Sequence, residues 1–298
     1  MKVVIITNSR EKDSLMPDVK FELVKKTLAP LVVERWFIED ESCFAMLDAI
    51  EAEDIVLVET KDETTIHQIA IRGLRHTGEI PSAVMFDADK VKLRSALVGT
   101  EVRMPFLVPS ADMLEEDRDY FVKPLILEDS LGIDEHSLCH TPDEVKARVE
   151  YLRKEFDKPA IIEEYIKGYD VTVGIIRFGR GYLLSAMRID STLDGVPFQS
   201  EKVKVEDHRA FFDMRSINGI LDDVLKRLTM QTFKAIGAEN YARMDYRVTE
   251  NGAPFLLEVN LYPGLKDTGA MYRSFELVGM PYDKFLYTVL NTAQRKLL

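Results

Sequence analysis

The chain has 298 residues and carries 39 Lys and Arg against 51 Asp and Glu, which gives a formal charge of −12. Its 46% hydrophobic and 30% charged residues are typical of a globular protein and exclude a disordered or collagen-like chain. The longest apolar runs, such as residues 55–58, are far shorter than the roughly 20 residues that cross a bilayer, so we expect no membrane association. An acidic chain lacks the clustered Lys and Arg that bind nucleic acid. Cys43 and Cys139 form no disulfide framework, which favours a reducing compartment, and we expect the cytoplasm.

Short apolar runs alternate with amphipathic segments over residues 1–87, a pattern typical of βαβ units around a parallel sheet. Helices are expected after the first strand, ending at Pro30, and over the apolar i, i+3 positions of residues 44–50 and 66–74. The expected strands are residues 3–6, 32–37, 54–58 and 82–86. This part of the sequence therefore predicts a small open α/β domain.

The rhythm changes after Asp87. Residues 88–166 predict a compact α+β unit with a helix near 89–98, strands at 104–108 and 120–123, and a helix over 142–156. Thr141 and Glu144 form a capping box around Pro142, which fixes the start of that last helix.

From Ala160 onward the sequence is rich in hairpins. We expect strands at 161–165, 171–178 and 182–189, then a helix from about 217 to 236 with Ser216 as its cap and Gly237 at its end. A last hairpin, residues 241–248 with 254–260, precedes a helical C-terminus.

The last hairpin carries the most chemical information. An Asn-Gly dipeptide at 251–252, between two alternating runs, is the strongest short-range hairpin signal. A two-residue turn there places Asp245 opposite Glu258 and Arg243 opposite Asn260, and opposed residues share a face.

The two faces of this hairpin differ in character. Two opposed carboxylates repel each other, and oxygen ligands beside an arginine suit Mg²⁺ that also binds phosphate. The alternative is a solvated face on which Arg243 and Arg247 neutralise the acids. The other face is apolar and should pack on a core, with Met244, Tyr246, Val248, Phe255, Leu257 and Val259.

Four motifs occur in the order found in one known superfamily. The segments 243–245 and 257–264 resemble the metal and phosphate hairpin of the ATP-grasp enzymes, closest to the D-alanine–D-alanine ligase branch. Upstream, Asp89-Lys90, Val122-Lys123-Pro124 and the segment 162–170 match the family's other motifs. Each motif is weak alone, but their joint order over about residues 85–295 is specific.

The resemblance implies an α/β protein with the ATP-grasp fold. Residues 1–87 would form a Rossmann-like N-terminal domain, which matches the family only in architecture. Residues 88–166 would be the central α+β lobe, and residues 167–298 the C-terminal lobe with the metal and phosphate hairpin.

The resemblance also implies roles for individual residues. Taken alone, Lys90 or Lys123 would be interpreted as an ordinary surface lysine. ATP would be held through its phosphates, adenine amino group and ribose hydroxyls by Lys90, Lys123, Ser130, Glu163, the main chain of Glu164 and Ile166, and Asp170. Mg²⁺, with Mn²⁺ as an alternative, would bind Asp245, Glu258 and Asn260. Arg243 and a loop lysine, Lys202 in preference to Lys204, would act on the transferred phosphoryl group.

The sequence departs from the family in three places. Glu128 and Asp129 stand where the family has Gly and Ser in its phosphate loop. Residues 7–11 replace a Gly-Gly-x-Ser-x-Glu segment, and residues 266–269 replace the Ser-Leu pair that holds the acceptor carboxylate. The nucleotide half matches and the amino-acid half does not, so D-alanine is not assumed for either substrate. Arg10, Lys12 and Lys266 would then serve a larger or more acidic acceptor, or are surface charges.

The implied activity is ATP-dependent carboxylate–amine ligation through an acyl phosphate, releasing ADP and phosphate. Its substrates would be small amino acids or a peptide, and a homodimer is compatible with it. Two alternatives stay open, a phosphotransferase on the same scaffold and a nucleotide-binding module without turnover. The lysines and the metal set argue against the second.

Overall fold

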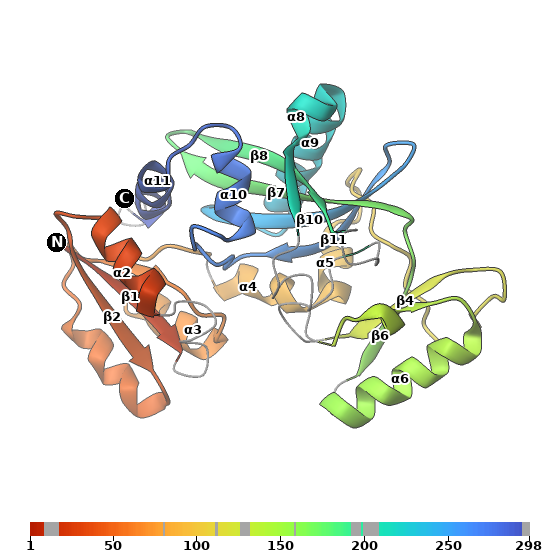
Figure 1. The fold of residues 1–298 in the computed structure, drawn as a ribbon. Coiled ribbons are helices and arrows are strands. Elements are labelled where there is room, and N and C mark those ends of the chain that lie inside the picture. The colour runs from red at the N-terminus through yellow and green to blue at the C-terminus, as the bar shows by residue number, and fades with distance from the viewer. Residues whose placement is uncertain are drawn as a thin grey trace.

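The fold contains three β-sheets, and each is formed by one part of the sequence: the N-terminal, the central and the C-terminal part (Figure 1). The computed structural model describes residues 1–8, 18–79, 81–110, 113–125, 132–157, 159–191, 198 and 209–293. The sheets of this described part are a parallel one of three strands, an antiparallel one of three and an antiparallel one of five. Within the same residues, no helix is both long and apolar enough to cross a membrane.

The N-terminal sheet has β1 (Lys2–Asn8) between β2 (Val32–Ile38) and β3 (Ile55–Val58). Helix α2 (Asp18–Thr27), the 3-10 helix η1 (Glu41–Ala49) and α3 (Glu63–Ile71) accompany it. Residues 3–6 and 55–58 are all buried, as expected for parallel strands covered on both faces. These elements fall where the alternation of apolar runs predicts them.

The fourth expected strand, residues 82–86, is wrong, because this segment lies in helix α4 (Pro81–Ala88). A short apolar run is compatible with either a strand or a buried helix. Pro81 has no N–H for a sheet but is well suited to the first turn of a helix. The neighbouring residues Ala83 and Val84 are both buried, which a two-sided strand and a packed helix satisfy equally.

The central part consists of α5 (Lys90–Ala96), β4 (Tyr120–Pro124), the 3-10 helix η3 (Glu135–Ser137), β5 (Leu138–Cys139), α6 (Pro142–Phe156) and β6 (Ala160–Glu164). Helix α6 begins as predicted, and the Thr141 hydroxyl accepts a hydrogen bond from the Glu144 N–H at 3.2 Å. The expected strand at 104–108 is wrong. That segment runs beside β6 and forms only one bridge, Leu107 with Glu163, because Pro105 cannot donate to a ladder.

The large sheet has the order β11-β10-β7-β8-β9. Its strands are β7 (Gly168–Phe178), β8 (Gly181–Asp190), β9 (Ala210–Asp213), β10 (Tyr241–Thr249) and β11 (Pro254–Asn260). Helices α8 (Met214–Ile217) and α9 (Gly219–Ala235) pack on one face, and α10 (Ala270–Glu276) and α11 (Tyr282–Ala293) on the other (Figure 1). The expected cap at Ser216 is wrong, because the Asn218 side chain accepts from the Leu221 N–H and starts α9.

Alternation along β7 and β10 decides which residues can reach a ligand. Val173 and Ile175 pack with α9, whereas Gly174 faces α10 so closely that an added Cβ would lie 2.7 Å from the Phe275 ring. Even-numbered residues of β7 and the odd-numbered residues of β10 that pair with them therefore lie on the face that α10 covers. Helices cover that face at one end of the two strands, and at the other end it carries Asp170, Thr172, Arg243, Asp245 and Arg247.

The hairpin of β10 and β11 contains both predicted pairs, Asp245 with Glu258 and Arg243 with Asn260. Its turn differs from the prediction. The Thr249 N–H donates to the Ala253 carbonyl at 3.0 Å, so three residues form the turn rather than two. Gly252 is the last of them, at φ +82°, a left-handed conformation that favours glycine.

A β-bulge compensates for the longer turn. The register shifts between Asp245 and Tyr246, and Tyr246 pairs with Leu256 rather than with Leu257. Leu256 is fully buried, while Phe255 and Leu257 are only half-buried. The expectation that these last two pack in the core is therefore wrong, because one extra residue reverses the faces.

Two acidic side chains join the N-terminal part to the large sheet. The buried Glu79 carboxylate accepts hydrogen bonds from three consecutive N–H groups, those of residues 239–241, at 2.8, 2.6 and 3.0 Å. The Asp87 carboxylate accepts from the Leu261 N–H at 3.0 Å. These contacts hold α4 against the end of β11, next to Asn260.

Candidate active site

A cavity of about 330 Å³ lies against the open part of the large sheet, and residues from all three parts of the chain line it. Lys202 and Ser130, which were also predicted, lie outside the described residues. The cavity brings together ten of the predicted site residues, Lys90, Lys123, Glu163, Glu164, Ile166, Asp170, Arg243, Asp245, Glu258 and Asn260.

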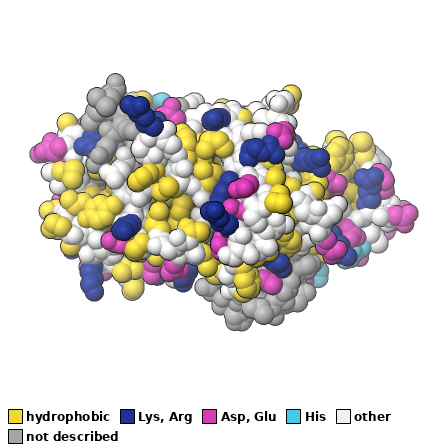
Figure 2. Space-filling view, turned by 90° about the horizontal axis from the view of Figure 1, so that it is seen from above, with side chains coloured by type: hydrophobic (Ala, Val, Ile, Leu, Met, Phe, Trp, Pro, Cys, Tyr) yellow, Lys and Arg dark blue, Asp and Glu magenta, His cyan; other side chains and the backbone are white. Residues whose placement is uncertain are grey.

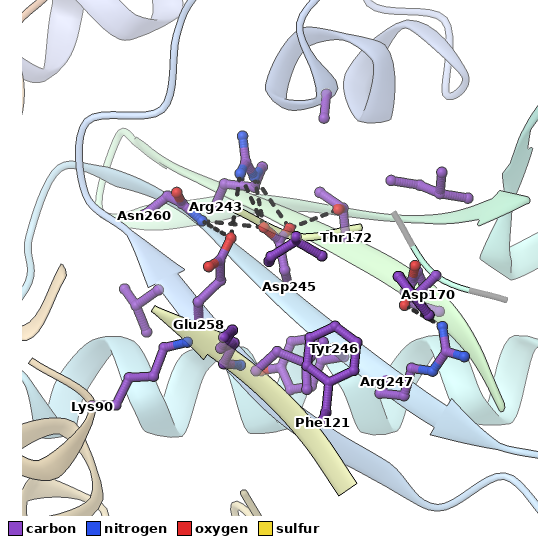
Figure 3. Close-up of a pocket in the computed structure, with 18 of the residues that line it drawn as sticks. Lys90, Phe121, Asp170, Thr172, Arg243, Asp245, Tyr246, Arg247, Glu258 and Asn260 are labelled. Atoms are coloured by element: carbon purple, nitrogen blue, oxygen red, sulfur yellow. Dashed lines mark hydrogen bonds and ion pairs between the residues drawn. The ribbon is translucent and has the colours of Figure 1, made fainter. Parts of the chain in front are cut away.

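The hairpin face forms a compact charged group (Figure 3). Arg243 donates through Nε and Nη2 to Asp245 at 3.1 and 3.0 Å, and its Nη2 lies 3.9 Å from Glu258. The Thr172 hydroxyl donates to Asp245 at 2.7 Å, and the Asn260 amide donates to Asp245 and Glu258 at 3.2 and 3.4 Å. Arg243 thus neutralises Asp245, which agrees on this point with the alternative interpretation of the hairpin as a solvated face whose arginines neutralise its acids.

Glu258 nevertheless repels Asp245 across the strand pair. Burial raises the pKa of Asp245, and the charge of Glu258 across the strand pair adds to this despite Arg243. No group of three or more His, Cys, Asp or Glu suited to a metal occurs among the described residues, so the candidate set consists of two carboxylates and one amide. Rotation of the Asn260 amide presents its oxygen in place of its nitrogen. These donors fit a hard divalent cation, whose charge would relieve the repulsion.

Lys123 and Glu163 form a buried ion pair at the wall opposite the hairpin. Glu163 is only 2% exposed, and Arg94 approaches its Oε1 to 3.6 Å. Burial by itself would raise the pKa of Glu163, but the neighbouring Lys123 and Lys90 outweigh it and lower that pKa. For Lys123, burial opposes the charge, yet Glu163 raises its pKa. Oε1 of Glu163 is buried and accepts no hydrogen bond within the described residues, although Arg94 lies near it.

Lys90 is the first residue of α5, whose start is fixed by Asp89 accepting hydrogen bonds from the N–H groups of Val91 and Lys92, both at 3.0 Å. Burial, together with the neighbouring charge of Lys123, lowers the pKa of Lys90 to about 7. Two ammonium groups held together in a partly dry cavity are a site for a polyanion.

This pKa predicts proton uptake when a nucleotide binds. Bound phosphate favours the charged amine and returns its pKa toward the ordinary 10.5. Between pH 7 and 10 the free protein then holds fewer protons than the complex. Relative to a Lys90→Met variant, ATP binding should take up about 0.9 proton at pH 8 and about 0.1 at pH 6. Calorimetry in buffers of different ionisation enthalpy measures this number. Equal uptake by both proteins at pH 8 would contradict a lysine contact with phosphate.

Aromatic side chains line the end of the cavity next to β4 and β6. The rings of Phe121 and Tyr165 are stacked with centroids 6.3 Å apart, and Phe198 meets Phe121 edge-on at 5.0 Å. A planar base fits such a wall. The Glu164 side chain accepts from the Phe106 N–H at 2.8 Å and is thereby held in place, in agreement with a role for its main chain rather than its carboxylate.

Arg247 is a site residue that the sequence interpretation missed. The sequence suggests it only as a counter-charge for Asp245 and Glu258, but the structure pairs it with Asp170, at 2.6 Å, and leaves it 4% exposed. The signal was present, because Arg247 follows Asp245 at the i+2 spacing that puts both on one face of a strand.

The cavity is also lined by residues 268–270, Lys61 and Asp87. The Lys61 amine lies 3.9 Å from the Asp87 carboxylate. Sequence reasoning missed both residues, because only the fold brings the segment after β3 and the end of α4 to this cavity. Lys266 is not among the described lining residues, and Arg10 and Lys12 lie outside the described residues.

On the face shown in Figure 2, acidic and basic side chains are interspersed, and several of both gather near its middle. The charge of this face is mixed, whereas a nucleic-acid backbone binds to extended basic surfaces.

Comparisons with known proteins agree with this geometry. Residues 115–291 match the family model of the D-ala D-ala ligase C-terminus. D-alanine–D-alanine ligase B of Clostridium perfringens is 32% identical over 142 residues, which are 48% of this chain and 45% of that protein. D-alanine–D-alanine ligase of Maridesulfovibrio salexigens is 27% identical over 190 residues, 59% of this chain and 56% of that protein. The chain thus spans about half the length of these two relatives.

The fold is also that of a solved ligase. The crystal structure of D-alanine–D-alanine ligase from Bacillus anthracis complexed with ATP has a TM-score of 0.77 at 18% identity, covering 99% of this chain and 98% of that one. The expected α/β class with the ATP-grasp fold is therefore confirmed. The family resemblance read from the four motifs is confirmed as well, because the family model covers more than half of the sequence. This chain belongs to the D-alanine–D-alanine ligase family.

Proposed function

We propose that this protein is an ATP-dependent, ADP-forming carboxylate–amine ligase that joins amino acids or a peptide through an acyl phosphate. The observation that carries the proposal is one cavity that holds the Arg243, Asp245, Glu258 and Asn260 face together with Lys90 and Lys123. Carboxylates and cations on opposite walls suit a metal-bound triphosphate between them.

The nucleotide lies along this cavity in the proposed complex. Its base occupies the aromatic end at Phe121 and Tyr165, and its phosphates run past Lys123 and Lys90 to the hairpin. A cation held by Asp245, Glu258 and Asn260 would draw charge off the phosphoryl oxygens, and these oxygen donors suit Mg²⁺, with Mn²⁺ as the alternative.

The chain's own residues act by position and fixed charge. A substrate carboxylate oxygen attacks the γ-phosphorus, the bond to the bridging oxygen breaks, and ADP leaves with an acyl phosphate formed. The amine nitrogen then attacks the acyl carbon, loses a proton, and phosphate departs with the carbon–oxygen bond electrons. Lys90 and Lys123 hold the phosphate chain and Arg243 lies beside the transferred group, so fixed positive charge offsets the charge of the transition state, and no protein nucleophile is required.

The proposed substrates enter beside Lys61 and Asp87. Groups of both signs there suit the carboxylate and the ammonium of an amino acid or peptide. The relatives are named for D-alanine, but residues 266–269 differ from the family's acceptor segment, so we propose the amino-acid class and leave the individual acid open. A cytoplasmic homodimer is part of the same proposal.

The proposal predicts that ADP release depends on two substrate groups. Amino acids and dipeptides with Mg²⁺–ATP should sustain ADP release, whereas an N-acetylated amino acid alone, which has no free amine, or an amino acid amide alone, which has no carboxylate, should not. Mass spectrometry should show a product equal to the two substrates minus one water. ADP release with a phosphorylated, unjoined product would instead indicate a phosphotransferase.

Nucleotide binding can be tested separately from turnover. Mg²⁺–ATP at about 100 times its dissociation constant should stabilise the fold by roughly 2.7 kcal/mol, seen as a higher melting temperature. Stabilisation without ADP release under any substrate pair would indicate a binding module. The absence of a shift at millimolar Mg²⁺–ATP would remove the nucleotide site altogether.

A further inference from the structure

We propose that Arg247 is a positioning residue that sets recognition of the nucleotide's ribose, by holding Asp170 and the adjoining segment 165–166 in one arrangement. The inference rests on the proposed function, because it concerns the nucleotide half of the same cavity. It concerns a contact within the protein, and Arg247 itself need not touch the nucleotide.

The guanidinium of Arg247 connects three groups that precede or begin β7. Its Nε donates to the Ile166 carbonyl at 3.0 Å, its Nη1 to Asp170 Oδ1 at 2.6 Å, and its Nη2 to the Tyr165 hydroxyl at 3.0 Å. Arg247 and Asp170 are also direct cross-strand partners of β10 and β7 (Figure 3). The planar five-donor guanidinium can satisfy all three acceptors at once, which a lysine amine on a flexible stem cannot do with the same geometry.

Burial makes this arrangement selective. Asp170 is 7% exposed and Arg247 is 4% exposed, so removing the arginine leaves a carboxylate in a partly dry wall. That wall is shared with a second cavity, which Lys167 and Arg188 also line. Without Arg247, these cations would draw the Asp170 carboxylate toward the second cavity and away from the nucleotide.

The ribose hydroxyls are the nucleotide groups that would donate hydrogen bonds to the fixed Asp170 carboxylate. A hydrogen bond from a hydroxyl to a charged acceptor is worth about 1.5–3 kcal/mol, or roughly 10- to 150-fold in affinity. This gain depends on an acceptor that is already in place, because ordering a mobile side chain on binding costs part of it. Arg247 supplies that preorganisation from the neighbouring strand.

The test compares the dissociation constants of ATP, 2′-deoxy-ATP and 3′-deoxy-ATP by calorimetry. In the natural protein at least one deoxynucleotide should bind 10-fold or more weakly than ATP. In Arg247→Met this ratio should fall below about 3, and in Arg247→Lys it should lie in between. Arg188→Met, which removes an arginine that lies over the Tyr169 ring in the same wall, should keep the full ratio.

Tyr165→Phe keeps the inference testable if Arg247→Met does not fold. It removes only the acceptor of the Nη2 hydrogen bond and leaves the Arg247–Asp170 pair, so the ratio should fall about 2- to 5-fold. A purely structural role would weaken ATP and both deoxynucleotides equally, leave the ratio unchanged in every variant, and overturn the inference. If the natural protein binds no ATP, the proposed function fails first, and a natural protein that binds ATP but ignores the ribose hydroxyls overturns only the inference.

Discussion

Glu258→Gln is expected to reduce turnover about 10³-fold while leaving the free energy of unfolding within about 0.5 kcal/mol of the natural protein. Catalysis suffers because the substitution removes one of two carboxylates that would hold the cation against the transferred phosphoryl group. Stability does not suffer, because Glu258 lies opposite Asp245 in the hairpin and its charge raises the pKa of that acid. Removing a repelling charge from a half-exposed position costs the fold little.

Glu250→Gln is the matched control, since it makes the same chemical change in the turn of the same hairpin. Its turnover number should stay within twofold of the natural value. Initial rates of ADP release and chemical unfolding of the three proteins give both quantities. If Glu258→Gln unfolds or loses several kcal/mol, Glu258 supports the fold rather than the metal, and the assignment of the hairpin face is wrong.

Lys123→Met is expected to lower the free energy of unfolding by about 3 kcal/mol, because it leaves Glu163 charged and buried with only Arg94 and Lys90 to compensate. The contact that is lost is the ion pair between two side chains that are 7% and 2% exposed. Lys92→Met is the control, since it removes a lysine that is half-exposed and whose ion pair with Asp89 is 3.4 Å long, and it should cost less than about 0.5 kcal/mol.

A double-mutant cycle separates the pair from the packing around it. Lys123→Met with Glu163→Gln should cost at least about 1.5 kcal/mol less than the sum of the single variants, because neither member is then left charged and alone. Acid offers a second check. The pKa of Glu163 is lowered in the folded protein, so its contribution is complete above the ordinary value of 4.5 and is lost as the pH falls through the folded value. The deficit of Lys123→Met should therefore shrink below pH 4.5, and a constant deficit would place its origin in packing.

The hairpin shows how a local pattern can predict a site while missing its details. Alternation alone placed Arg243 and Asp245 on one face and Met244 on the other, because successive strand residues must point to opposite sides. The predicted two-residue turn is wrong, yet the metal-face pairs are those expected, since the bulge at Leu257 restores the register. A bulge depends on how both strands bend against the neighbouring structure, which no short segment encodes.

The start of a helix could be predicted where a capping residue marks it, but the secondary structure of a short apolar run could not. Helix α6 starts at Pro142 as predicted, because the Thr141 hydroxyl caps it within four neighbouring residues. The other half of the predicted capping box is wrong, since the Glu144 carboxylate accepts from the His140 N–H at 2.6 Å. Residues 82–86 have the same apolar character as a strand, but they form a helix that packs against α3, α5 and β11.

The sequence by itself determined the class of fold, the family and the polar face that would meet a metal and phosphates, because these depend on periodicity and on motifs in a fixed order. Only the tertiary structure decided the partners across the cavity. Lys61 reaches it from the N-terminal sheet, and Arg247 joins Asp170 across two strands that are 77 residues apart in the chain. The pairing of Lys123 with Glu163 likewise arises where β4 and β6 meet. Such contacts depend on which surfaces the folded chain brings within a few ångströms, where burial strengthens charge interactions that are negligible in the unfolded chain.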